Sequence, residues 1–309
     1  MTIQEATYFI LNKLRPIYAE GEASQITDWV MENLTGSKKA ERMIYKTSAI
    51  TKKEEILLQE YAERLAKHEP VQYVLNEAWF CGLKFYVDKH VLIPRPETEE
   101  LVEWVMREVG REKEVDSDES IVDSTESIVD SRESGAGSRG QKISILDIGT
   151  GSGCIAIALK RKLKNVEVWS CDMSEAALKV AKRNAEIINV DVNFLLLDFL
   201  SEEERNQLPS FDIIVSNPPY VPQKDKSSMQ PNVLNYEPHT ALFVPDNDAL
   251  IFYKEITQFG KDHLKPGGII YAEIHESIGE EVTALFRSFG YNTELKNDMQ
   301  GKDRMMKAW

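Results

Sequence analysis

An apolar run passes directly into a glycine-rich turn at Ile143-Ser144-Ile145-Leu146-Asp147-Ile148-Gly149-Thr150-Gly151-Ser152-Gly153. A short apolar run bounded by turn residues fits a buried strand, and glycines accept the positive φ angles of a tight turn. A helix is predicted directly afterwards, over 154–163. In a parallel sheet built from such units, ligands bind at the carboxyl ends of the strands. The turn is therefore the first candidate for a binding site.

Strands and helices alternate from Lys142 to the end of the chain. Strands are predicted at 143–148, 166–171, 192–197, 211–216, 268–274, 291–295 and 304–309. Helices are predicted at 154–163, 174–188, 249–264 and 278–289. This alternation predicts an α/β fold, a mainly parallel Rossmann-like sheet with helices on both faces.

Residues 1–70 have a helical pattern instead and predict a small bundle of about four helices. A third, short helix is expected after Ser37, with Met43 and Ile44 facing inward. Thr51 with Glu54 three positions later is typical of a capping box that opens a longer helix. Residues 71–93 are rich in β-forming residues around Gly82, which predicts a hairpin.

Residues 111–141 form an acidic, low-complexity insert. The sequence Glu-Ser-Ile-Val-Asp-Ser occurs at 119–124 and again at 126–131, and glycine and serine dominate 134–140. Two copies are too few for a coiled coil, and such a composition buries too little apolar surface to offset the entropy of ordering. We expect a mobile segment. The expected domains are thus a helical domain at 1–70, a hairpin linker at 71–96 and the sheet domain at 97–309.

Composition narrows the function. The chain has 309 residues, a net charge of -14, and three cysteines without metal or disulfide spacing. The acidic balance disfavours a nucleic-acid binder, which needs clustered Lys and Arg. No apolar run is long enough to span a membrane, and the first residues lack a signal-peptide pattern. We expect a cytoplasmic protein, with no membrane partner, no direct DNA binding and no metal, since the five histidines show no metal spacing.

The glycine turn departs from the dinucleotide fingerprint. That fingerprint is G-x-G-x-x-G, whereas Gly149 to Gly153 has the spacing G-x-G-x-G, with Cys154 where the third glycine belongs. The spacing suits S-adenosylmethionine, which has no phosphate. The plain alternative is a tight turn without a ligand. The candidate cofactor residues in the turn are Gly149, Thr150, Gly151, Ser152 and Gly153.

Two later strand ends add candidates. Asp172 follows the second parallel strand, where a carboxylate can accept hydrogen bonds from both ribose hydroxyls. Asp198 and Phe199 follow the third strand and are candidates to flank an adenine. The plain alternatives are a helix-capping Asp172, and a polar turn beside a core phenylalanine.

The motif Ser216-Asn217-Pro218-Pro219-Tyr220 after the fourth strand points to the chemistry. Prolines hold the loop extended and remove two N–H donors. The Asn217 side-chain oxygen and the Pro218 carbonyl can then accept both hydrogens of an NH2 group. Tyr220 offers a flat face for a planar amide or base.

These motifs resemble those of class I methyltransferases that modify amide or exocyclic nitrogens. The stretches Phe80–Phe85 and Leu92-Ile93-Pro94-Arg95-Pro96-Glu97-Thr98-Glu99, after a helical N-terminal domain, narrow the resemblance to the HemK/PrmC family of peptide chain release factor glutamine methyltransferases. The resemblance covers almost the whole chain except 111–141. One departure is His275 in Glu273-Ile274-His275-Glu276, where the family pattern has glycine.

The resemblance implies that S-adenosyl-L-methionine is the cofactor and that class I release factors, through the glutamine of their Gly-Gly-Gln loop, are the partners. It implies catalytic roles for Asn217, Pro218 and Tyr220, with Pro219 completing the substrate site and Asn217 also near the cofactor. Arg95 either contacts the release factor or pairs with a nearby glutamate. We expect a monomer. The alternatives are a ribosomal-protein glutamine methyltransferase, an adenine or guanine exocyclic-amine methyltransferase, and a non-enzymatic cofactor sensor.

Overall fold

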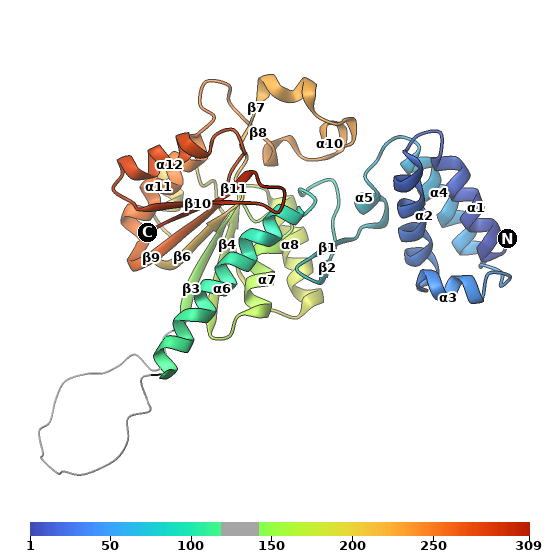
Figure 1. The fold of residues 1–309 in the computed structure, drawn as a ribbon, viewed down its shortest axis with the longest axis horizontal. Helices are drawn as coiled ribbons and strands as arrows, with labels where there is room; N and C mark the ends of the chain where they lie inside the picture. Colours follow the sequence, from blue (N-terminus) through green and yellow to red (C-terminus); the bar gives the residue numbers. More distant parts are fainter. Residues whose placement is uncertain (119–141) are drawn as a thin grey trace, which may run out of the picture.

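The computed structural model describes residues 1–118 and 142–309. A helical N-terminal region and a larger α/β region are joined by a short hairpin (Figure 1). Within the described residues, no helix is both long and apolar enough to cross a membrane.

Five helices precede the hairpin, four of them within residues 1–70. They are α1 Ile3–Leu14, α2 Glu20–Thr35, α3 Lys39–Ile44, α4 Lys52–Leu65 and α5 Val71–Leu75. The predicted capping box at Thr51 is confirmed, because its hydroxyl accepts from the Glu54 N–H and the Glu54 carboxylate accepts from the Thr51 N–H. Gly36 ends α2 in the left-handed conformation. Helix α5 was not predicted.

The inward orientation predicted for Met43 and Ile44 is wrong. Both side chains are exposed, and α3 begins after Lys38 rather than at Ser37. The buried residue of this short helix is Arg42, which donates to the Ser37 carbonyl and to Asp28. A six-residue helix has one inward stripe, and here an ion pair occupies it.

The hairpin after α5 consists of β1 Ala78–Phe80 and β2 Leu83–Phe85, paired antiparallel. Cys81 and Gly82 form its two-residue turn and both have positive φ, which matches the twist of a tight hairpin. Phe80 and Phe85 are buried against the main core. The hairpin thereby anchors the start of the α/β region.

The central sheet has seven strands in the order β10-β11-β9-β6-β3-β4-β5. Their bounds are β3 Ile143–Ile148, β4 Val166–Asp172, β5 Asn193–Leu196, β6 Phe211–Ser216, β9 Leu264–Glu273, β10 Thr293–Asn297 and β11 Asp303–Ala308. All neighbouring pairs from β9 to β5 are parallel, and β11 is antiparallel to both of its neighbours. The predicted α/β fold is confirmed.

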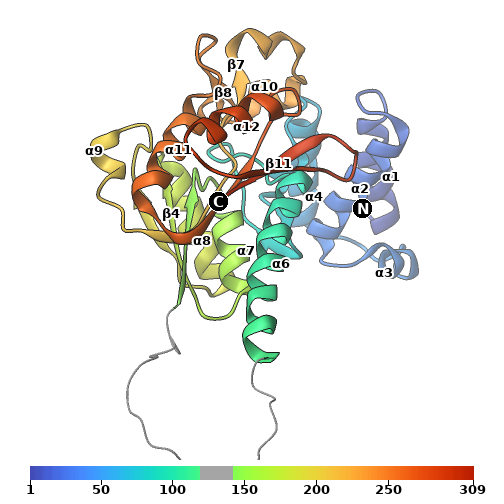
Figure 2. The ribbon, with the colours of Figure 1, turned by 60° about the vertical axis from the view of Figure 1, so that its left-hand side comes forward.

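Helices cover both faces of this sheet (Figure 2). On one face lie α6 Pro96–Asp118, α7 Cys154–Lys162 and α8 Glu175–Ile188, and on the other α11 Ile251–His263 and α12 Gly279–Ser288. Helix α6 continues to Asp118, into the stretch that the sequence assigns to the insert. The rest of the predicted insert, 119–141, lies outside the described residues.

Short elements that the sequence pattern does not predict lie between β5 and α11. They are α9 Glu202–Arg205, β7 Val221–Pro222, η1 Gln223–Ser228, α10 Pro231–Tyr236, η2 His239–Ala241 and β8 Phe243–Val244. Strands β7 and β8 pair with each other, and Figures 1 and 2 show them with α10 beyond one end of the central sheet. The Tyr236 hydroxyl donates to the Lys67 carbonyl, so α10 also contacts the N-terminal region.

Candidate active site

A pocket opens where the chain reverses its direction of travel across the sheet. From β3 the chain moves outward to β4 and β5, then returns to the other side of β3 as β6. Such a switch point leaves a crevice at the carboxyl ends of the two strands. The pocket there holds about 790 Å³ of empty space, part of it open to solvent.

The pocket brings together most of the residues predicted for the site. Those on its wall are Gly149, Gly151, Asp172, Asp198, Phe199, Asn217, Pro218 and Pro219. They come from the ends of four parallel strands, which explains why short motifs far apart in sequence could be assigned to one site.

Gly149 and Gly151 form the floor of the pocket. Their φ angles are 78° and 53°, which disfavours any residue with a side chain, and a Cβ at either position would meet open space. Gly153 differs, because its Cβ would lie 2.8 Å from Ile157 Cδ1 and 3.2 Å from Ala181 Cβ. The first two glycines thus face the pocket, whereas the third allows α7 and α8 to pack closely.

Thr150, Ser152 and Gly153 do not line the pocket. Thr150 is buried and donates to the Asp147 carboxylate at 2.8 Å, and Ser152 is buried as well. Asp147 also accepts from the Ser170 hydroxyl at 2.9 Å. Burial raises the pKa of Asp147 to about 6, against the opposing effect of these hydroxyls. The hydrogen bond from Thr150 to Asp147 therefore holds this part of the turn on the side away from the pocket.

Asp172 links the turn to the next strand. One carboxylate oxygen accepts from the Gly151 N–H at 2.9 Å, and the other accepts from the Ser174 N–H at 2.8 Å. Burial raises the pKa of Asp172, and the two backbone donors partly offset that rise. The carboxylate also lies on the pocket wall, so it both fixes the turn and offers acceptors to a ligand.

The far wall combines Asp198 with apolar groups. Phe199 is buried edge-on against Phe259, with 5.2 Å between ring centroids. Sequence reasoning missed further wall residues from two irregular segments and from helices: His90, Val91, Leu92, Met173, Pro238, Thr240, Ala241 and Phe252. Only Met173, directly after Asp172, had a signal in its position. Phe252 lies in the helix predicted at 249–264, but nothing in that pattern places it at the pocket.

Asn217 directly follows β6, and its side chain is hydrogen-bonded to a threonine of α6. Its Nδ2 donates to Thr98 Oγ1 at 3.0 Å. In the part of the chain that the structure describes, no group donates to Asn217 Oδ1. Tyr220 does not line the pocket. Its hydroxyl donates to Glu273 at 3.3 Å, and its ring lies 5.7 Å from that of His275.

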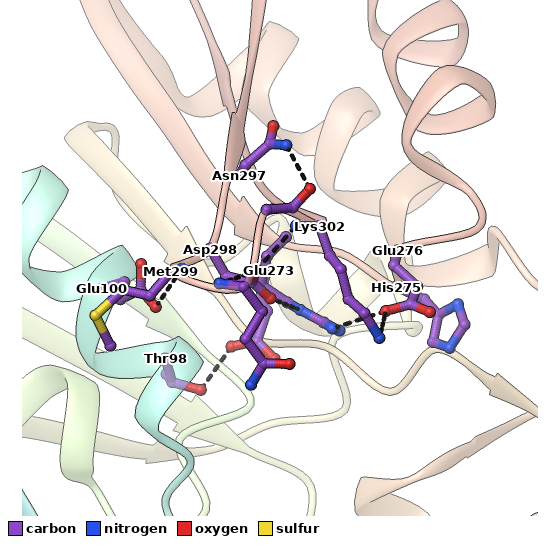
Figure 3. Close-up of polar contacts among 12 residues, drawn as sticks. Thr98, Glu100, Glu273, His275, Glu276, Asn297, Asp298, Met299 and Lys302 are labelled. Atoms are coloured by element: carbon purple, nitrogen blue, oxygen red, sulfur yellow. Dashed lines mark hydrogen bonds and ion pairs between the residues drawn. The ribbon is translucent and has the colours of Figure 1, made fainter.

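Glu273 is a buried carboxylate that sequence reasoning left without a role. It accepts from the Thr98 hydroxyl at 2.5 Å (Figure 3). It also accepts from the Tyr220 hydroxyl. Burial raises its pKa to about 7, although the Thr98 hydrogen bond and the charge of Arg304 act in the opposite direction. Its position at the last residue of β9 was the available signal, because parallel strand ends meet at one edge.

Arg95 forms the ion pair that was one of its two predicted roles. Its Nη2 contacts both Glu237 oxygens, at 2.7 and 2.9 Å, and the Glu237 side chain is 1% exposed. The Ile93 N–H also donates to Glu237, at 3.3 Å. This pair joins the loop before α6 to the segment after α10, and both segments contribute to the pocket wall.

The chemistry of the pocket suits a nucleoside joined to an amino acid. Its described wall carries two aspartates and no lysine or arginine, which disfavours a pyrophosphate and favours a ligand with hydroxyl and ammonium donors. Open space above the glycines leaves room for close approach to the backbone. The fold and this pocket define a class I methyltransferase with S-adenosyl-L-methionine as its methyl donor.

Comparison with known proteins narrows the class to one family. The profile of the PrmC N-terminal domain matches residues 10–75, and that of the Methyltransferase small domain matches 130–235. The chain is 43% identical over 256 residues to the release factor glutamine methyltransferase of Flavobacterium psychrophilum, covering 82% of this chain and 79% of that protein. It is 36% identical to that of Bacteroides thetaiotaomicron over 98% of both chains. It belongs to the release factor glutamine methyltransferase family.

A solved structure with a similar fold is the human methyltransferase 10 domain containing protein. It has a TM-score of 0.46 and 17% identity, and the match covers 74% of this chain and 89% of that chain.

Proposed function

We propose that this enzyme transfers a methyl group from S-adenosyl-L-methionine to the side-chain amide nitrogen of the glutamine in the Gly-Gly-Gln motif of peptide chain release factors. The names of its relatives support the substrate. The single structural observation that carries the chemistry is the Asn217 side chain, whose Nδ2 is bound to Thr98 while Oδ1 stays available as an acceptor.

The cofactor is proposed to lie across the glycine floor. Gly149 and Gly151 give it close access to the backbone, Asp172 accepts from its ribose hydroxyls, and Asp198 and Phe199 flank its base. The buried turn residues Thr150, Ser152 and Gly153 shape this loop. When bound, S-adenosyl-L-methionine supplies an electrophilic methyl carbon on a sulfonium.

The acceptor pair is proposed to hold the substrate. Asn217 Oδ1 and the Pro218 carbonyl each accept one hydrogen of the glutamine NH2, while Pro219 keeps the loop extended and Tyr220 covers the flat amide. Holding the nitrogen in line for attack is worth roughly 7–11 kcal/mol in favourable cases. The two oxygens also stabilise positive charge as it develops on the nitrogen. As the N–C bond forms, the bond between the methyl carbon and sulfur would break and leave a neutral thioether. The proton is lost to water afterwards, so no side-chain base is required.

The N-terminal helices are proposed to grip the body of the release factor, because one glutamine offers little surface for affinity. We also propose that the chain is divided into a helical domain at 1–70, a linker at 71–96 and a catalytic domain at 97–309. The partner is a component of translation, so we place the enzyme in the cytoplasm. We also propose that it acts as a monomer and does not bind DNA directly.

The deciding experiment measures labelled methyl transfer to three acceptors side by side: a purified release factor, ribosomal protein and DNA. Mass mapping then locates the modified residue. Methylation of the Gly-Gly-Gln glutamine is expected. Preferential labelling of ribosomal protein or of DNA would replace the proposed substrate with one of the alternatives.

A further inference from the structure

A chain of hydrogen bonds ties the proposed catalytic amide to a buried carboxylate. Thr98 lies in the first turn of α6, Asn217 directly follows β6, and Glu273 ends β9. Asn217 Nδ2 lies 3.0 Å from Thr98 Oγ1, which lies 2.5 Å from Glu273 Oε2. Figure 3 shows Thr98 and Glu273 pointing toward one another from their two elements. Thr98 is 2% exposed and Glu273 1% exposed, so water does not compete for these bonds.

The hydrogens in this series of hydrogen bonds all point toward Glu273. A hydroxyl has one hydrogen, and Thr98 gives it to Glu273 Oε2. Its oxygen is then an acceptor toward Asn217, which must present NH2 rather than its carbonyl. The reversed amide would place two acceptor oxygens against each other. The carboxylate therefore determines, through Thr98, which end of the Asn217 amide faces the pocket.

We propose that Thr98 and Glu273 are positioning residues for methyl transfer, which hold the Asn217 amide so that Oδ1 faces the substrate nitrogen. This inference rests on the proposed function and adds two residues to it. Neither residue lines the pocket, so both act through Asn217. Tyr220 donates to the other Glu273 oxygen, and the same carboxylate thus also orients the ring proposed to cover the substrate amide.

The ionisation of Glu273 should appear in the rate. A proton on Oε2 would turn that oxygen into a donor, and the Thr98 hydrogen would lose its acceptor. The groups that act on the Glu273 carboxyl are Glu97 and Thr98 of α6, Arg304 of β11 and the Tyr220 hydroxyl. The Tyr253 hydroxyl of α11 donates to the Glu273 main-chain carbonyl instead. With burial as the largest effect, the groups that act on the carboxyl leave its pKa at about 7. We expect kcat to fall below pH 7, by about tenfold per unit once the acid form dominates.

The test compares variants of the full-length enzyme in methyl transfer to a release factor. Thr98→Val removes the hydroxyl at nearly constant shape and should lower kcat roughly 100-fold, the cost of a small misplacement. Its KM for S-adenosyl-L-methionine should stay within a few fold. Thr98→Ser restores the hydroxyl and should recover most of kcat. The matched control is Thr283→Val, because the Thr283 hydroxyl is buried and, among the described residues, bonds only to the Gly279 carbonyl of its own helix.

Glu273→Gln supplies a readout that a merely structural role would not move. Its carbonyl can still accept from Thr98, so activity should remain within about tenfold, and the fall of kcat below pH 7 should disappear. An unchanged kcat in Thr98→Val, or a Glu273→Gln variant with the wild-type pH profile, overturns the inference. A wild-type enzyme that methylates no release factor would instead overturn the proposed function, so the two failures are distinguishable.

Discussion

Asn217 donates from Nδ2 to Thr98 Oγ1 at 3.0 Å, although 119 positions separate the two residues in sequence. The contact joins the loop after β6 to the first turn of α6. The motif Asn217–Tyr220 therefore does not by itself determine which way the Asn217 side-chain amide points. That direction comes from a second element, which must pack correctly before the site is complete.

Replacing Asn217 tests the acceptor pair directly. Asn217→Ala should lower kcat by roughly 100-fold or more, because one of two dipoles aimed at the developing charge is lost. Binding of S-adenosyl-L-methionine, measured by calorimetry, should change only a few fold. Full activity in this variant would remove the proposed role of the acceptor pair.

The glycine floor can be tested with a matched pair of substitutions. Gly151→Ala places a methyl group in the pocket at a φ of 53°, and should weaken S-adenosyl-L-methionine binding by about tenfold or more. Gly36→Ala introduces similar backbone strain at a φ of 67° in the remote C-cap of α2. Calorimetry should find cofactor affinity unchanged in the Gly36 variant. Equal losses in both would mean that strain, and not the occupied space, is responsible.

The Arg95–Glu237 pair should stabilise the pocket wall. Arg95→Met leaves a buried carboxylate without its partner and should cost about 2 kcal/mol, less than the roughly 3–5 kcal/mol of a fully buried pair because Arg95 is partly exposed. The pKa of Glu237, already raised by burial, should rise further. In denaturant unfolding, the double variant Arg95→Met/Glu237→Gln should recover part of the loss. Strictly additive losses would show that the two side chains are not coupled.

Burial of Glu273 also makes stability depend on pH. Its folded-state pKa of about 7 lies above the ordinary value of 4.5, so the folded protein binds a proton that the unfolded chain releases. Stability from this group is greatest at low pH and is lost as pH rises from about 4.5 through about 7. Relative to Glu273→Gln, the wild type should therefore lose on the order of 3 kcal/mol across that interval. Denaturant unfolding of both proteins at several pH values gives this difference, and a constant difference would contradict it.

The sequence was sufficient for the sheet because strand and helix periods are local signals. The predicted strand at 211–216 matches β6, and the predicted helix at 174–188 differs from α8 by one residue at its start. Met43 and Ile44 show where this reasoning fails, since their exposure depends on the Arg42–Asp28 ion pair with another helix.

The candidate site was predictable as far as strand ends could be recognised. Asp172 ends β4 and Asn217 directly follows β6, and parallel strand ends converge. Thr98 and Glu273 were in view as parts of motifs, but their contact spans 175 positions and depends on how α6 crosses the end of β9. No period or spacing in a single sequence carries that information.

The direction of α6 has a practical consequence. The helix begins beside the pocket and, over its 23 residues, extends about 35 Å away from it. Strand β3 starts at Ile143 at the opposite end from its glycine turn. Asp118 and Ile143, the described ends on either side of 119–141, therefore both lie at the base of the sheet, remote from the pocket. A fluorescent protein or an affinity tag could be grafted there as a reporter of the enzyme's whereabouts while turnover continues.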